Sequence, residues 1–133
     1  MIQQRFTFTK VERLKSLKLI GQIFKEGKSF AYFPFRGIYI YPKENSSYLQ
    51  ATFSVSSKNF KKAVDRNRIK RLMREAYRLQ KNALKTKLER SQIYLAVFII
   101  YTGNELPVFE KILEKMEHLL ERLEKAVPGN QEN

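Results

Sequence analysis

The longest helical pattern in this chain runs over residues 65–88 and contains neither glycine nor proline. At about 100° per residue, its apolar and its basic side chains fall on opposite sides of the helix. A helix with one apolar side must bury that side against a second layer of structure. The pattern therefore predicts a long helix, capped near Asp65, that packs through one side and offers positive charge on the other. The apolar side consists of Ile69, Leu72, Met73, Ala76, Leu79 and Ala83.

The segments around this helix predict a small sheet. Residues 30–42 combine aromatic and β-branched residues with Pro34, Gly37 and Pro42, a composition typical of one or two short strands near a sheet edge. After a turn, residues 49–56 alternate apolar and polar side chains, which predicts a strand with one buried face. The continuous apolar run over residues 93–101 predicts a central strand that is covered on both faces.

Two more helices complete the pattern. Residues 16–27 have near-helical apolar spacing between a possible N-cap at Ser16 and a possible C-cap at Gly27. A last helix opens at Pro107 and carries one long apolar stripe. This order predicts an α+β fold, a two-layer sandwich of helices on a sheet, as one domain over residues 1–127 with a flexible tail at 128–133.

Positive charge is concentrated in one quarter of the chain. The net charge is +13, and residues 58–90 alone carry thirteen basic and three acidic side chains, whereas residues 91–133 carry four and seven. Such an uneven field predicts a one-sided surface for a polyanion, with nucleic acid as the first candidate. The basic side of the long helix consists of Arg66, Asn67, Lys70, Arg71, Arg74, Arg78, Lys81 and Lys85.

Arginine predominates on this side of the helix, and its planar guanidinium pairs with phosphate in a two-point geometry that lysine cannot form. An ordinary solvated helix surface explains the pattern less well, because the repeated like charges cost free energy. DNA is the weaker partner, since no helix-turn-helix, zinc or zipper context is evident. The composition favours RNA.

Several other classes of function are disfavoured. The chain has no cysteine, which excludes a disulfide framework, thiolate metal sites and thiol catalysis. His118 is the only histidine, and no carboxylate cluster accompanies the basic segment, so we expect neither a protein active site, a bound metal nor a small-molecule substrate. No apolar run reaches the roughly 20 residues of a membrane-spanning helix, and the first ten residues lack a secretion signal, so we expect a cytoplasmic protein.

The segment Ala63-Val-Asp-Arg-Asn-Arg-Ile-Lys-Arg-Leu-Met-Arg-Glu75 closely resembles the Arg-Asn-Arg signature of the bacterial ribonuclease P protein component. Residues 23–29, 53–58 and 93–100 resemble the same family, so the resemblance covers most of the chain. It implies an α-β-β-β-α-β-α sandwich with a left-handed crossover. It also implies a protein that assists a catalytic RNA, which works with Mg²⁺, in removing the 5′ leader from precursor tRNA.

The resemblance implies two RNA-binding surfaces. The signature helix would bind the ribonuclease P RNA, although Arg68 lies off the main basic side. A cleft between the first helix and the open face of the sheet would receive the leader, with Phe24 and Ile20 from the helix, although Ile20 replaces an aromatic residue common in the family. The residues implied for the RNA subunit are Arg66, Asn67, Arg68, Lys70, Arg71, Arg74 and Arg78, and those for the leader are Phe24, Ile20, Thr52, Ser54, Ser56 and Lys58.

Alternatives remain at this stage. Phe24 fits plain core packing as well as leader binding. The aromatic residues of the 30–42 segment could stack on RNA bases, but core packing is favoured for Tyr32, Phe33, Phe35, Tyr39 and Tyr41. A ribosomal or ribosome-assembly protein of the same fold would share the charge, and an autonomous nuclease would cleave RNA without an RNA subunit.

Overall fold

A four-stranded mixed sheet lies at the centre of the computed structural model, which describes residues 7–128. The strands follow the order β1-β2-β4-β3, so β4 is central as predicted, and a short 3₁₀ turn, η1, precedes the first helix. The elements are η1 Lys10–Glu12, α1 Leu17–Glu26, β1 Lys28–Tyr32, β2 Phe35–Ile40, β3 Leu49–Val55, α2 Ala63–Gln80, α3 Asn82–Ser91, β4 Leu95–Tyr101 and α4 Phe109–Ala126.

Strand pairing fixes which side chains share a face of the sheet. β1 pairs with β2 and β2 with β4 in antiparallel fashion, whereas β3 and β4 are parallel, with Thr52 opposite Phe98 and Ser54 opposite Ile100. Parallel strands need a long connection, and here α2 and α3 supply it. The left-handed sense of this crossover stays a prediction.

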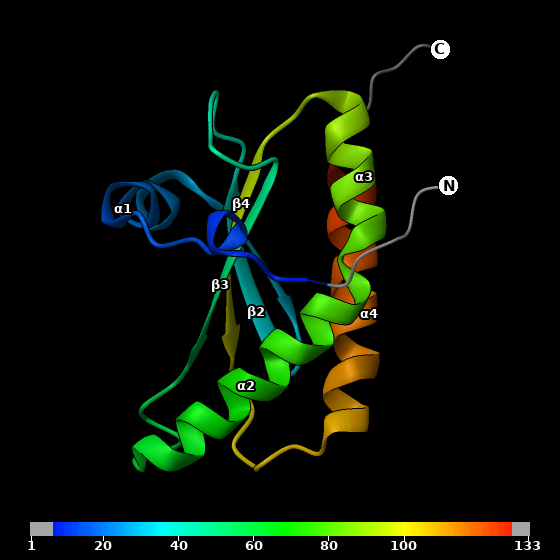
Figure 1. Ribbon diagram of the computed structural model, residues 1–133. Coiled ribbons are helices and arrows are strands. Elements are labelled where there is room, and N and C mark those ends of the chain that lie inside the picture. The colour runs from blue at the N-terminus through cyan, green and yellow to red at the C-terminus, as the bar shows by residue number, and fades with distance from the viewer. Residues whose placement is uncertain (1–6, 129–133) are drawn as a thin grey trace.

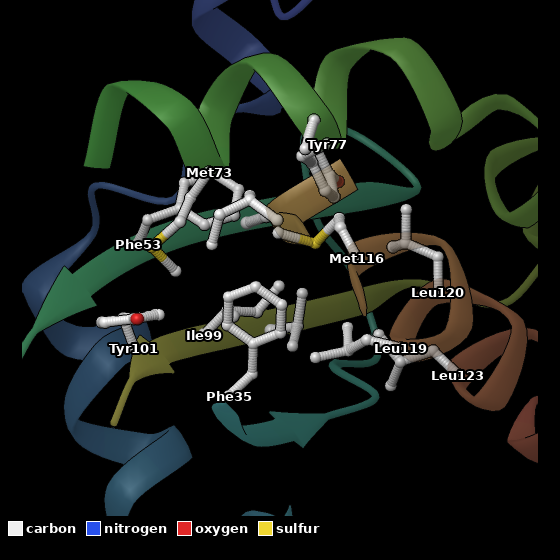
Figure 2. Close-up of a cluster of buried hydrophobic side chains, with 14 of the residues drawn as sticks. Phe35, Phe53, Met73, Tyr77, Ile99, Tyr101, Met116, Leu119, Leu120 and Leu123 are labelled. Atoms are coloured by element: carbon white, nitrogen blue, oxygen red, sulfur yellow. The ribbon is translucent and has the colours of Figure 1, made fainter. Parts of the chain in front are cut away.

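One face of the sheet carries the main core. Helices α2, α3 and α4 cover this face, while α1 lies on the opposite one (Figure 1). The core side chains interdigitate between α2, α4 and the strands (Figure 2), and Tyr77 packs edge to face against Phe53 with the ring centroids 5.2 Å apart. Burial of the apolar stripes of α2 and α4 thus leaves the basic side of α2 outside the core.

The opposite face is only partly covered. Helix α1 begins after Ser16, whose Oγ accepts a 3.1 Å hydrogen bond from the Leu19 amide, and ends at Gly27, so both predicted caps are confirmed. Its buried Ile23 joins a small second core with Ile38 and Ala96. The rest of this surface, called here the open face of the sheet, presents Thr52, Ser54, Phe98 and Ile100.

Helix boundaries differ from the sequence prediction in three places. The long helix begins at Ala63 with Lys62 as N-cap, so Asp65 lies in the first turn and caps nothing. The last helix begins at Phe109, two residues after Pro107. The predicted helix over residues 65–88 is two helices, α2 and α3, which meet at Lys81 and run in different directions (Figure 1).

Most of the aromatic residues of the β1–β2 hairpin pack into the core as predicted. Phe35 is buried, and Tyr32, Tyr39 and Tyr41 are half-buried against the main core. Phe33 is the exception, because it lies between the two strands and is 72% exposed. Core packing is therefore wrong for Phe33 and confirmed for the other four.

Candidate nucleic-acid interface

The packing of its inner side on the sheet determines which residues α2 presents on its outer side. Ile69, Met73, Ala76 and Tyr77 are all fully buried on the sheet. Because an α-helix has 3.6 residues per turn, this anchoring turns the polar residues of α2 outward. Four of the predicted site residues are exposed and three are half-buried on this outer side. The exposed residues are Asn67, Arg68, Arg71 and Arg74, and the half-buried residues are Arg66, Lys70 and Arg78.

Arg66 supports the start of the helix. Its Nη1 donates 2.8 Å hydrogen bonds to the backbone carbonyls of Phe60 and Lys61. These contacts fix the segment that enters α2, because α2 has no side-chain cap of its own. Arg66 therefore has a structural role besides the RNA contact that the sequence suggested.

Arg78 lies beside a carboxylate. Its Nη2 is 2.6 Å from Glu75 Oε2, and this hydrogen bond lowers the pKa of Glu75. Both side chains are exposed to a substantial degree, so the pair is screened by water and contributes little to stability. The pair does, however, reduce the positive field at this end of the helix.

Lys81 and Lys85 do not belong to the basic side, which corrects the sequence interpretation. Lys81 is 1% exposed and its Nζ lies 3.3 Å from Glu12 Oε2, while Lys85 Nζ lies 2.6 Å from the same oxygen. Burial opposes ionisation of Glu12, but the hydrogen bond from Lys85 and the charges of both lysines lower its pKa overall. A helical wheel cannot distinguish a lysine that forms an ion pair with a buried carboxylate from one that faces solvent.

Arg74 lies among like charges. Partial burial lowers its pKa, and the positive charges of Arg13 and Arg71 lower the pKa further. Arg13 precedes α1, and no sequence pattern marks it as part of the basic surface. Its place beside α2 depends on the pairing of its segment with β3, which no local pattern reveals.

The open face of the sheet gathers the residues expected to bind the leader. Phe24 of α1 packs edge to face on Phe98 of β4, with the ring centroids 4.9 Å apart, yet Phe24 remains 53% exposed. Thr52, Ser54 and Ser56 are half-buried along β3 and just beyond it, and Lys58 is exposed. Phe24 is thus no core residue, and Phe98 is a further aromatic of this face that the sequence analysis treated only as part of a buried strand.

Ile20 has a different environment. It is half-buried and packs against the small second core beneath α1. The side chain therefore contributes to docking α1 on the sheet, at the edge of the same surface. Its apolar contact with a leader stays a prediction.

The described residues show no metal site or membrane span. Between residues 7 and 128 there is no group of three or more His, Cys, Asp or Glu side chains placed to hold a metal ion. Within the same range, no helix is both long and apolar enough to cross a bilayer. The Nδ1 atom of His118 lies 3.5 Å from Oε1 of Glu121, and both side chains are exposed on α4. His118 is thus on a different helix from the basic residues of α2.

Comparison with known families decides between the RNA-binding classes. The family model described as Ribonuclease P matches residues 8–124, which includes all of the fold except the last two residues of α4. The chain belongs to the ribonuclease P protein family. Its role is that of the protein component of this ribonucleoprotein endoribonuclease.

Relatives in the family match nearly the whole chain. The ribonuclease P protein component of Porphyromonas gingivalis is 39% identical over 126 residues, covering 94% of this chain and 92% of the relative. The corresponding protein of Chlorobium phaeobacteroides is 35% identical over 130 residues and covers 86% of each chain. Because both alignments span most of both proteins, the resemblance is not confined to the signature helix.

Solved structures of family members share the fold. The RNase P protein of Staphylococcus aureus superposes with a TM-score of 0.64 at 27% identity, covering 86% of this chain and 96% of that one. The Thermotoga maritima protein gives a TM-score of 0.66 at 28% identity, covering 84% and 96%. The α+β fold and the predicted family are therefore confirmed.

Proposed function

We propose that the protein binds the ribonuclease P RNA through α2 and the 5′ leader of precursor tRNA through the open face of the sheet. Both contacts would promote removal of the leader to give the mature 5′ end of the tRNA. The observation that carries this proposal is the outer side of α2, where Arg68, Arg71 and Arg74 are exposed on a helix whose inner side is fully buried. A rigid, arginine-rich helix can contact several phosphates without losing much conformational freedom.

The contacts with the ribozyme would be electrostatic and positional. Arg68, Lys70, Arg71 and Arg74 lie within about two turns of one helix and suit the phosphates of a folded RNA. Asn67 is exposed beside them and can donate hydrogen bonds to sugar or phosphate oxygens. Arg66 and Arg78 would contribute less, because backbone carbonyls and Glu75 already engage them.

The leader surface combines rings, hydroxyls and charge. The exposed face of Phe24 offers one stacking surface, and Phe98 supports it from the sheet. Hydroxyl groups of Thr52, Ser54 and Ser56 line the strand beyond, and Lys58 lies at its end. Such a set suits an extended single strand of any sequence, because every base has a flat face and every nucleotide a phosphate.

The chemistry of cleavage would reside in the RNA subunit. Mg²⁺ would be held mainly by RNA, whose phosphate oxygens are ligands that this ion prefers. The protein's own residues would hold the two RNA molecules and offset the repulsion between their phosphates. The protein would act in the cytoplasm, together with its precursor tRNA substrate.

A reconstitution experiment tests the proposal. Wild-type protein is added to a bacterial ribonuclease P RNA at low magnesium concentration, and cleavage of precursor tRNA is followed. We expect faster cleavage than with RNA alone, and no cleavage when the RNA subunit is omitted. A protein that gives no gain over RNA alone contradicts the proposal, and cleavage without RNA would make the chain an autonomous nuclease.

A further inference from the structure

Two adjoining hollows separate α2 from the chain segment that precedes α1. Their volumes are about 220 Å³ and 290 Å³, and both are lined by Phe8, Arg13 and Arg74. Arg71 lines the first hollow and Lys15 the second. The two hollows together form one depression beside α2. Basic residues from two segments far apart in the chain therefore line this depression.

We propose that Arg13 and Arg74 together bind a single phosphate group of the RNA in this depression. The inference rests on the proposed function and adds to it a residue outside the signature helix. On this view α2 supplies only half of the site, and the segment before α1 completes it.

The backbone around Arg13 is held in place on β3. The Leu14 amide donates a 2.9 Å hydrogen bond to the Ala51 carbonyl, and Arg13 itself forms a bridge with Ala51. One residue earlier, Glu12 is anchored to Lys81 and Lys85. Arg13 thus projects from a fixed backbone on both of its sides, which limits the conformational entropy that ligand binding would cost.

The Arg13 side chain is also oriented before any ligand binds. Its guanidinium carbon lies 5.4 Å from the centre of the Phe8 ring. Phe8 in turn packs edge to face on Phe53 and Tyr77, with the ring centroids 6.0 Å and 5.3 Å apart. A guanidinium stacked on an anchored ring keeps its N–H groups free at the edges, which is the geometry that pairs with phosphate.

The positive charges around the depression favour binding of an anion there. The side chains of Arg13, Arg71 and Arg74 all line the first hollow. Partial burial lowers the pKa of Arg74, and the positive charges of Arg13 and Arg71 lower it further. Among residues 7–128, none of these three arginines forms an ion pair with a carboxylate; Glu75, which also lines the first hollow, pairs with Arg78. Gathered like charges repel each other, and a phosphate between them converts that repulsion into charge-assisted hydrogen bonds.

The position of the hollow suits RNA rather than a free ion. Thr52 and Ala51 of the edge strand β3 line the second hollow together with Arg74 of α2, so this hollow lies beside α2 at the β3 edge of the sheet. An RNA backbone bound along α2 would therefore reach the depression without leaving the basic surface. A phosphate held there would fix the register of the RNA on the protein.

A double-mutant cycle tests the shared phosphate. Affinity for a bacterial ribonuclease P RNA is measured over a range of salt for wild type, Arg13→Gln, Arg74→Gln and the double variant. We expect each single variant to bind about tenfold more weakly, with a salt slope flatter by about one. The double variant should lose much less than the product of the two single effects, because both arginines serve one phosphate.

Two further variants separate charge, geometry and folding. Arg90→Gln removes an exposed arginine at the end of α3 and should leave affinity within about twofold and the salt slope unchanged. Arg13→Lys keeps the charge and should keep the slope while losing part of the affinity, because lysine lacks the two-point geometry. Melting temperatures check that each variant is folded.

The inference is overturned if Arg13→Gln behaves like Arg90→Gln, or if the effects of Arg13→Gln and Arg74→Gln multiply. In either case wild-type binding to the RNA leaves the proposed function standing. If wild type itself fails to bind the RNA in a salt-dependent way, the proposed function fails as well.

Discussion

Glu12 accepts a 2.6 Å hydrogen bond from Lys85, 73 residues further along the chain. The same carboxylate oxygen lies 3.3 Å from Lys81, which is buried where α2 ends and α3 begins. This network ties the segment before α1 to the junction of the two helices. It therefore fixes two things at once, the direction change between α2 and α3 and the position of Arg13 beside α2.

Removing the carboxylate charge should destabilise the fold. Glu12→Gln keeps the size of the side chain but leaves the Lys81 ammonium buried without a counter-charge. We expect a loss of about 3 kcal/mol in the free energy of unfolding, measured by denaturant titration. Glu114→Gln, an exposed glutamate on α4, is the matched control and should change stability by less than about 0.5 kcal/mol. Equal effects of the two variants would mean that the network does not hold the fold together.

The same network predicts a pH dependence. The pKa of Glu12 in the folded state is lowered from its ordinary value of 4.5, so folding favours the ionised form. The stability that Glu12 contributes is therefore present above pH 4.5 and is lost as the pH falls through the lower pKa of the folded state. Melting temperatures of wild type and Glu12→Gln should converge as the pH is lowered through this range. A constant difference across the acidic range would contradict this sign.

The open face of the sheet predicts a leader-specific defect. Phe24→Ala removes the exposed ring that packs on Phe98, and loss of one stacked base costs about 1 kcal/mol or more. We expect about a fivefold or greater loss of affinity of the holoenzyme for precursor tRNA and no change for mature tRNA, which lacks a leader. Phe33→Ala removes another exposed aromatic, away from this face, and serves as the control. Equal weakening for both tRNAs would assign Phe24 to folding instead of leader binding.

A buried hydroxyl offers a test of the core. Tyr77 is fully buried between Phe8 and Phe53, and its hydroxyl has no hydrogen-bond partner within the part of the chain that the structure describes. Tyr77→Phe should therefore leave stability unchanged or raise it by about 1 kcal/mol. Tyr101→Phe is the matched comparison, because the Tyr101 hydroxyl donates a 2.8 Å hydrogen bond to the Glu105 carbonyl, and its loss should cost about 1 kcal/mol. If both variants lower the stability, or both raise it, the contrast between an unpaired Tyr77 hydroxyl and a hydrogen-bonded Tyr101 hydroxyl is contradicted.

Local patterns predicted most of the architecture because each depends on residues close together in sequence. The alternation over β3, the apolar run of β4 and the caps at Ser16 and Gly27 are all of this kind. The family signature in turn predicts that the basic side of α2 binds RNA, which stays a prediction. Contacts between distant segments were the part that could not be predicted.

Lys81 illustrates the limit of pattern analysis. On a helical wheel Lys81 belongs to the basic side. In the structure it is buried, and its ammonium donates a hydrogen bond to Glu12, 69 residues away. Arg13 shows the reverse, since it has no helical neighbours to mark it and reaches the basic side only through pairing with β3. The exposure of Phe33 likewise depends on the turn between β1 and β2 and not on its aromatic character.

The absence of cysteine allows the central claim to be tested directly. A single cysteine introduced as Arg68→Cys on α2, or as Glu114→Cys on the outer side of α4, can carry a tethered iron chelate that cleaves nearby RNA. In the complex with ribonuclease P RNA, we expect strong scission from position 68 and none above background from position 114. Scission from position 114 alone, or equally from both, would contradict the assignment of α2 as the surface that binds the ribozyme.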